Sequence, residues 1–227
     1  MHAPQEATPM NGAESLVTTL AASGVELCFT NPGTSEMHFV AALDRIPGVR
    51  CVLGLFEGVV TGAADGYWRM AGKPAATLLH LGPGLGNGLA NLHNAGKARS
   101  GIVNVVGDHA LDHARHESPL KSAAAAIAGS VSGWVRSCQS AAEVGLDAAA
   151  AVQATRDGAV GRIATLLLPA DTAWSAGGRA AVAAPAAAPS FDAAAVPATA
   201  QWLTQLGPRA LLLLGAGGSA SERAQHL

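Results

Sequence analysis

The stretch from residue 76 to residue 106 reads ATLLHLGPGLGNGLANLHNAGKARSGIVNVV. Its two ends, Ala76–His80 and Ile102–Val106, are short apolar runs. They predict buried strands, because neither run alternates with polar residues. Between them, Gly86–Ala98 has the residue spacing of a helix. A strand, a helix and a strand in this order predict a unit with two parallel strands.

The same alternation continues on both sides of this unit. Strands are predicted at Val25–Thr30, Val49–Leu53 and Ile163–Leu168, and helices at Ala13–Ala22, Ser35–Leu43, Glu57–Ala71 and Ala141–Thr155. Repeated strand–helix pairs predict an α/β fold, in which helices cover both faces of a parallel sheet. We expect residues 1–175 to form this domain.

The composition changes beyond that domain. Residues 176–200 are rich in Ala, Pro and Gly and carry few charges, so an interdomain linker is expected there. A helix is predicted at Ala198–Leu206, and a strand at Arg209–Leu214 runs into the turn Gly215–Gly218. Residues 201–227 are therefore expected to begin a second, truncated α/β domain, because about thirty residues cannot bury a core.

Composition also excludes several function classes. The net charge is -2 and no cluster of Lys or Arg is present, so no nucleic-acid partner is expected. The apolar run Leu211–Leu214 is far shorter than the ~20 residues of a membrane span. The N-terminus has no secretory signal and the three cysteines form no close pair, which favours a cytoplasmic location. Cys28 and Cys51 are expected to be buried in strands.

Glu57 is a lone carboxylate at the junction between an apolar strand and a helix of small residues. One interpretation is a first-turn acid that complements the helix dipole. The other is a desolvated carboxylate, between Phe56 and Val59, that needs a specific hydrogen-bonding partner. The spacing alone leaves both open.

Two glycine-rich loops are predicted after strands, at Asn31–Glu36 (NPGTSE) and His80–Asn87 (HLGPGLGN). Glycine permits close approach of the backbone to a ligand, and open α/β sheets bind ligands at this edge. The G-x-G-x-G run is a weak dinucleotide signal, because no acidic residue ends the following strand. Thr34 and Ser35 could instead cap the next helix, with Glu36 supporting its first turn.

As a set, these motifs resemble the pyrimidine-binding domain of thiamine-diphosphate-dependent enzymes. This group contains acetolactate synthase, pyruvate oxidase and benzoylformate decarboxylase. The resemblance covers residues 11–172 and rests on F-x-N-P-G-[ST]-x-E at Phe29–Glu36, E-x-x-x-x-G-x-A-D-G-Y at Glu57–Tyr67, G-P-G-x-x-N at Gly82–Asn87, and Gly107-Asp108.

The resemblance implies thiamine diphosphate as the cofactor and a 2-oxo acid as the substrate. It implies that Glu57 hydrogen-bonds ring nitrogen N1′ of the cofactor's aminopyrimidine and promotes its imino tautomer. Pro32, Gly33, Gly84 and Asn87 would contact the same cofactor.

It also implies that the active site is shared. In this family the diphosphate and Mg²⁺ are held by another domain, through a Gly-Asp-Gly motif that this chain lacks. The expected partner is a diphosphate-binding domain, from a missing C-terminal part or a second chain, in a homodimer or homotetramer. The Gly215–Gly218 turn would open a central domain that holds FAD in some members, but too little of it is present to support a flavin.

His80 bears on the subgroup. Acetolactate synthases usually have a small hydroxyl residue at the matching position, whereas benzoylformate decarboxylase has a histidine in the pattern H-x-x-x-G-x-G-N. The resemblance implies that His80 relays protons to or from the substrate and that Thr34 contacts the substrate. In contrast, the sequence Gly-Pro-Gly at Gly82–Gly84 resembles that of the acetolactate synthases.

Several functions therefore stay open. The first is a thiamine-diphosphate-dependent 2-oxo acid decarboxylase or carboligase of the acetolactate synthase-like group, with a benzoylformate decarboxylase-like lyase as the alternative. Such an enzyme is expected to be inactive as this isolated chain. A non-catalytic regulatory or partner module is a further alternative, and a nucleotide-binding domain is a weaker one.

A polar loop follows the strand that ends at Val106, and it contains His109, Asp112, His113, His116 and Glu117. The spacing His-x-x-x-His suits zinc on a helix, but nothing fixes a third and a fourth ligand. No metal site is therefore expected within this chain. We expect the loop to lie near the mouth of the active site.

Overall fold

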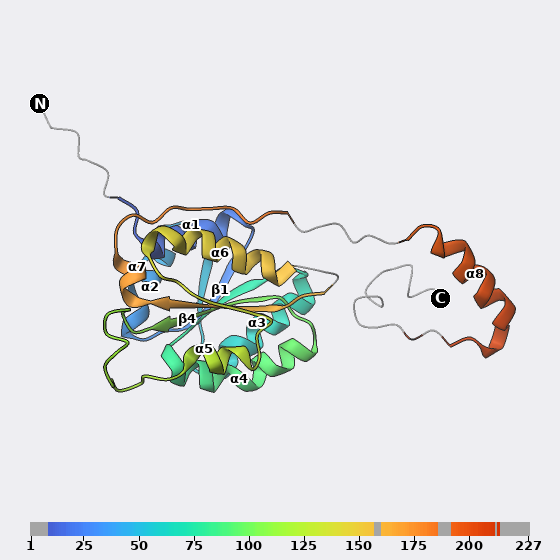
Figure 1. Ribbon diagram of the computed structural model, residues 1–227, viewed down its shortest axis with the longest axis horizontal. Helices are drawn as coiled ribbons and strands as arrows, with labels where there is room; N and C mark the ends of the chain where they lie inside the picture. Colours follow the sequence, from blue (N-terminus) through green and yellow to red (C-terminus); the bar gives the residue numbers. More distant parts are fainter. Residues whose placement is uncertain (1–8, 157–159, 186–191, 212, 214–227) are drawn as a thin grey trace, which may run out of the picture. The chain divides into compact units, whose positions relative to one another are not determined.

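The computed structural model describes residues 9–156, 160–185, 192–211 and 213. Its centre is a six-stranded sheet with the order β2-β1-β3-β4-β6-β5, in which every neighbouring pair is parallel (Figure 1). The strands are β1 (Leu27–Asn31), β2 (Arg50–Leu53), β3 (Ala75–Leu79), β4 (Ile102–Asp108), β5 (Trp134–Ser137) and β6 (Ile163–Pro169). The predicted fold class is confirmed.

Helices cover both faces of the sheet, and each face has its own apolar core (Figure 1). One face carries α1 (Gly12–Ala22), α2 (Met37–Arg45), α6 (Ala141–Arg156) and the short α7 (Ala170–Trp174). The other carries α3 (Glu57–Ala71), α4 (Leu81–Lys97) and α5 (Ala124–Gly129). Strands β3 and β6 are buried on both faces, which explains their continuous apolar sequences.

Strand β2 differs because it is at the edge of the sheet. Three of its four residues are exposed, and Cys51 is one of them. The expectation that Cys51 is buried is therefore wrong, whereas Cys28 on the neighbouring strand β1 is buried as expected.

The glycine-rich segment His80–Asn87 is helical from Leu81 onward, with His80 as the N-cap, and the prediction that it forms a loop is wrong. Helix α4 begins at Leu81, directly after β3. Pro83 is tolerated there because the N–H groups of a first helical turn have no partner within the helix. The glycines allow close packing: a Cβ on Gly88 would lie 2.9 Å from Thr61 of α3, whose hydroxyl donates to Gly88 O at 3.1 Å.

A row of buried polar side chains crosses the middle of the sheet. Thr77 Oγ1 on β3 donates to Asn104 Oδ1 on β4 at 2.7 Å, and Asn104 Nδ2 donates to Thr165 Oγ1 on β6 at 3.0 Å. Ser132 Oγ lies 2.7 Å from the same Thr165 hydroxyl. Since these polar groups pair only in one alignment, they favour the observed register of the three strands.

The chain divides into two compact units, Met1–Ala186 and Ala187–Leu227. Near the end of the first unit, the N–H of Ala181 donates to Thr19 Oγ1 at 2.9 Å and that of Ala183 donates to Ser23 Oγ at 3.0 Å. This segment therefore packs beside the C-terminal half of α1. The extent of the linker stays a prediction.

The second unit contains α8 (Ala195–Leu206), where a helix was predicted, and a 3-10 turn, η2 (Gly207–Arg209). No residue of α8 is buried. Part of the strand predicted at Arg209–Leu214 and all of the Gly215–Gly218 turn lie outside the described residues. Within the described ranges, no helix combines the length and the apolar character that crossing a membrane requires.

Candidate active site

The candidate residues gather where β1 and β3 end side by side. The chain leaves β1 through a 3-10 turn, η1 (Thr34–Glu36), toward α2 on one face, and leaves β3 toward α4 on the other. Open α/β sheets bind ligands in the crevice at such a switch point. The sequence motifs that follow these two strands are therefore brought to one place.

Glu57 is the first residue of α3 and is 8% exposed. Its Oε2 accepts a hydrogen bond of 3.0 Å from Asn87 Nδ2 on α4. The residue is thus both a first-turn acid and a buried carboxylate with a specific partner, so the two interpretations left open by the sequence hold together.

The second oxygen of Glu57 is bounded by Gly84. A Cβ at position 84 would lie 3.0 Å from Glu57 Oε1, closer than almost all real contacts of a Cβ atom. Among the described residues, Oε1 accepts no hydrogen bond, and it is not one of the fully buried unpaired atoms. One oxygen of the carboxylate is therefore fixed by the protein and the other is available to a ligand.

His80 is the last residue before α4, and its side chain is 25% exposed. Its Nδ1 lies 2.8 Å from Oε2 of Glu36. The next residue, Leu81, has φ 52°, a left-handed conformation that is costly for a residue with a Cβ. The backbone is strained at the point where the chain turns His80 toward the crevice.

Glu36 has a fully buried side chain. The N–H of Gly33 donates to its Oε2 at 2.7 Å, which is half of a capping box around η1. Its Oε1 has no hydrogen-bond partner in the part of the chain that the structure describes. The sequence placed Glu36 within a motif but assigned it only to support a helix, and its contact with His80 was missed.

Three glycines make room for the three polar side chains. A Cβ on Gly33 would overlap the His80 ring, and a Cβ on Gly107 would overlap the Glu36 carboxylate. Gly84 stands in the same relation to Glu57. The structure thus gives Gly33 and Gly84 a packing role, and their contact with a cofactor stays a prediction.

Thr34 lies at the start of η1 and is exposed. It does not cap a helix, because Gly33 is the N-cap of η1 and Glu36 that of α2, neither with a side-chain cap bond. The capping interpretation of Thr34 is wrong, and its contact with a substrate stays a prediction, as does that of Pro32 with the cofactor.

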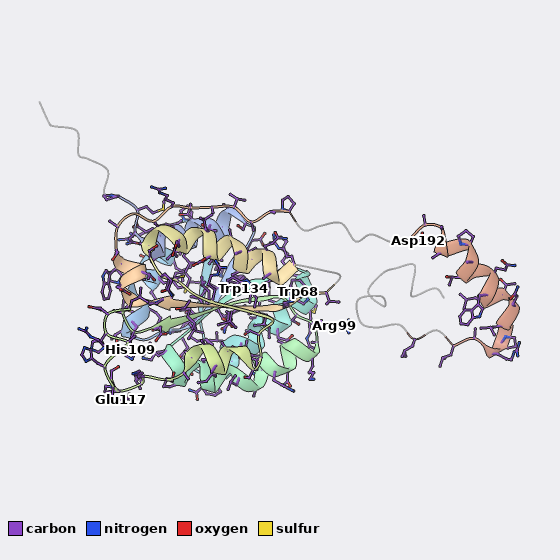
Figure 2. The ribbon with its side chains drawn as sticks, in the orientation of Figure 1. Trp68, Arg99, His109, Glu117, Trp134 and Asp192 are labelled. Carbon is purple, nitrogen blue, oxygen red and sulfur yellow. The ribbon has the colours of Figure 1, made fainter. Side chains whose placement is uncertain are left out.

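The polar loop between β4 and α5 borders the same edge. Figure 2 shows His109 and Glu117 at the end of the sheet opposite to Arg99, which precedes β4. At the far end of the loop, Ser122 occupies the space that a Cβ on Gly82 would need, so the loop reaches the start of α4. In the described part of the chain, no group of three His, Cys, Asp or Glu side chains is arranged to hold a metal ion.

Exposed apolar side chains precede and follow Glu57 in the sequence. Leu53 is 66% exposed, Leu55 90% and Val59 59%, and Phe56 is also exposed. Neighbouring exposed apolar residues of this kind mark surfaces that bind other protein segments.

The match to a known family agrees with this fold and site. The family model of the thiamine pyrophosphate enzyme N-terminal TPP-binding domain matches residues 10–128. The chain belongs to this family, and the resemblance drawn from its motifs is confirmed.

Two individual relatives show which enzymes of the family the chain is similar to. The chain is 57% identical over 206 residues to "Putative acetolactate synthase large subunit IlvX" of Mycobacterium tuberculosis, covering 91% of this chain and 39% of that protein. It is 40% identical over 84 residues to benzoylformate decarboxylase of Pseudomonas aeruginosa, which is 37% of this chain and 16% of that protein.

The solved structure of a thiamine diphosphate-dependent 4-hydroxybenzoylformate decarboxylase from Rhodococcus jostii RHA1 superimposes with a TM-score of 0.75 at 25% identity. The match covers 86% of this chain and 38% of that one. The chain therefore spans about two fifths of the length of IlvX and of the Rhodococcus enzyme.

The residues present fit the aminopyrimidine end of thiamine diphosphate. A ring nitrogen of that group needs one hydrogen-bonding partner, and Glu57 Oε1 is a polar atom in the crevice without one among the described residues. Glu57 would hold this end of the cofactor, with Asn87 fixing its carboxylate.

Proposed function

We propose that this chain supplies the aminopyrimidine-activating half of the active site of a thiamine-diphosphate-dependent 2-oxo acid decarboxylase or carboligase of the acetolactate synthase-like group. The observation that carries the proposal is the Glu57 carboxylate, buried at the start of α3 with Oε2 bonded to Asn87 and Oε1 free of hydrogen bonds among the described residues. The 57% identity to a relative described as an acetolactate synthase large subunit supports the choice of group.

When bound, the cofactor supplies the carbon nucleophile and the electron sink that decarboxylation requires. The chain's own residues orient it and move protons. Glu57 hydrogen-bonds the pyrimidine ring through Oε1, and Asn87 prevents its carboxylate from rotating away. His80 lies across the crevice and exchanges a proton with the substrate, which Thr34 contacts.

A second domain completes the site. We propose that it binds Mg²⁺ and the diphosphate, since no metal-binding group is found among the described residues. The exposed apolar side chains of Leu53, Leu55 and Val59 next to Glu57 support a partner that covers this edge. A homodimer or homotetramer in the cytoplasm accommodates such sharing and agrees with three free cysteines. No flavin is proposed.

A benzoylformate decarboxylase-like lyase is the second candidate. His80 favours it, because the resemblance gives benzoylformate decarboxylase a histidine at the matching position; its Nδ1 lies 2.8 Å from the buried Glu36 carboxylate, and its side chain is partly exposed. The 4-hydroxybenzoylformate decarboxylase of Rhodococcus jostii RHA1 shares the fold over 86% of this chain. A non-catalytic partner module is the third candidate, and it would use the same surface without turnover.

The test uses the complete enzyme, whether the chain continues into the second domain or pairs with another polypeptide. Pyruvate and benzoylformate are assayed side by side with thiamine diphosphate and Mg²⁺, for the wild type and for Glu57→Gln. We expect turnover of one substrate and a loss of at least about 10²-fold in Glu57→Gln. Glu26→Gln, on an exposed side chain just before β1, is the control. Full activity of Glu57→Gln contradicts the proposed role, and a complete assembly that turns over neither substrate favours the partner module.

A further inference from the structure

We propose that Glu36 is a positioning residue that fixes the tautomer of His80, so that Nδ1 carries the resting proton and Nε2 is the nitrogen that exchanges protons with the substrate. This inference rests on the proposed function, because His80 has a proton to exchange only where a 2-oxo acid reacts. It adds a residue and an atom to that function: the buried carboxylate of Glu36 and one particular nitrogen of His80.

The donors around Glu36 define the tautomer. Oε2 of Glu36 lies 2.8 Å from His80 Nδ1 and accepts the backbone N–H of Gly33 at 2.7 Å. An ionised carboxylate can only accept hydrogen bonds, so beside ionised Glu36 the Nδ1 atom carries the hydrogen. A neutral imidazole with hydrogen on Nδ1 has its lone pair on Nε2.

The burial of Glu36 indicates which nitrogen of His80 can reach the substrate. The side chain of Glu36 is 0% exposed, while that of His80 is 25% exposed. The Nδ1 edge of the imidazole therefore faces a buried carboxylate, which leaves Nε2 as the ring nitrogen without a hydrogen-bond partner among the described residues. Gly33 permits this placement, since a Cβ there would overlap the ring.

The carboxylate also matches the charge that the reaction creates. When Nε2 accepts a proton, the imidazole becomes a cation 2.8 Å from Glu36. Among the described residues, Glu36 Oε1 has no hydrogen-bond partner, so His80 and Gly33 are the donors that satisfy this buried carboxylate. The imidazolium and the carboxylate then form an ion pair, and return of the proton from Nε2 restores the neutral imidazole beside the carboxylate, so the step is a balanced proton transfer. An oriented carboxylate behind a histidine stabilises both the tautomer and the imidazolium.

Nuclear magnetic resonance of the 227-residue chain tests the tautomer without any turnover. The eight histidines are labelled with ¹⁵N, and His80→Gln identifies the His80 signals. In long-range ¹H–¹⁵N spectra at high pH, where imidazole is neutral, we expect the proton of His80 on Nδ1. In Glu36→Met, which removes the acceptor and keeps the bulk, we expect a second population with the proton on Nε2. A wild-type proton on Nε2, or a Glu36→Met spectrum equal to the wild type, overturns the inference.

A second variant covers the case in which Glu36→Met does not fold. Gly107→Ala places a Cβ where the Glu36 carboxylate lies, so it should displace the carboxylate and shift the His80 tautomer in the same direction. Glu26→Gln removes a carboxylate whose side chain is 55% exposed and which precedes β1, away from the strand ends that carry His80, so its His80 signals should match the wild type. An unshifted tautomer in a folded Gly107→Ala protein also counts against the inference.

The complete enzyme gives the functional readout. Glu36→Met should lower kcat by about 10²-fold with a much smaller change in KM, because proton transfer and not binding is impaired. Unchanged kcat together with a shifted tautomer overturns the link between Glu36 and catalysis. If instead Glu57→Gln is fully active, the proposed function fails, whatever the histidine spectra show, so the two failures are distinguishable.

Discussion

Asn87 Nδ2 lies 3.0 Å from Glu57 Oε2 and joins α4 to the first residue of α3. Two further bonds tie the same helices together, from Thr61 Oγ1 to Gly88 O at 3.1 Å and from Asn91 Nδ2 to Gly58 O at 2.6 Å. The carboxylate is therefore held by a rigid helix pair, which keeps its other oxygen in place for a ligand.

Asn87→Ala should weaken the function of Glu57 without unfolding the chain, because Asn87 is exposed and only its amide reaches the carboxylate. A hydrogen bond to a charged group is worth about 1.5–3 kcal/mol, so turnover of the complete enzyme should fall by at least about tenfold. Steady-state kinetics measures this loss. Asn94→Ala, an exposed asparagine on the same helix, should leave turnover unchanged, and equal effects of the two variants would contradict the prediction.

Gly84→Ala and Gly86→Ala change neighbouring turns of α4 but should affect different properties. The first should lower turnover, and the second should raise stability. A Cβ at Gly86 meets nothing within 4 Å, so Gly86→Ala should raise the free energy of unfolding by about 0.5–1 kcal/mol through helix propensity. A Cβ at Gly84 would lie 3.0 Å from Glu57 Oε1 and should reduce turnover by at least about tenfold. Denaturant unfolding and kinetics on both variants check this pair, and full turnover of Gly84→Ala would count against the assigned position of Glu57.

Asn104→Ala should lower the free energy of unfolding by about 2–3 kcal/mol. The change removes two buried hydrogen bonds and leaves the hydroxyl of Thr77 without its acceptor. Urea denaturation measures the loss, and the exposed Asn94→Ala should change stability by less than about 0.5 kcal/mol. A loss below that limit for Asn104→Ala would mean that the polar row contributes little to stability.

The three cysteines should react at different rates with a thiol reagent such as DTNB. Burial raises the pKa of the Cys28 thiol and that of the Cys138 thiol, so both are protonated and shielded at pH 8. Cys51 is exposed on the edge strand. We expect one fast equivalent in the native chain, none in Cys51→Ser, and all three after denaturation. A second fast equivalent in the native chain would show that Cys28 or Cys138 is accessible.

Most of the fold could be predicted from the sequence, because the buried parallel strands are continuous apolar runs. Strand β5 could not, since Trp134–Ser137 is too short to show a period. The start of α4 was placed too late for a different reason. Glycine and proline disfavour a helix locally, and the packing of α4 against α3 overrides that preference.

The site was predictable in part. Motif spacing indicated Glu57 and His80, and the structure brings both to the edge where β1 and β3 end. Glu36 was missed because its partner is 44 residues away, and only the pairing of β1 with β3 brings the two together. The role of Gly107, on β4, depends in addition on the pairing of β3 with β4.

The three glycines that face polar side chains have an evolutionary consequence. A side chain at position 107 either displaces the carboxylate at position 36 or requires a smaller residue there, since the two share one volume. The same exclusion joins Gly33 with His80 and Gly84 with Glu57. Substitutions within each pair should therefore occur together among homologues. A lineage that abandons the chemistry of Glu36 becomes free to fill the space at 107, so a bulky residue there would reveal the loss from sequence alone.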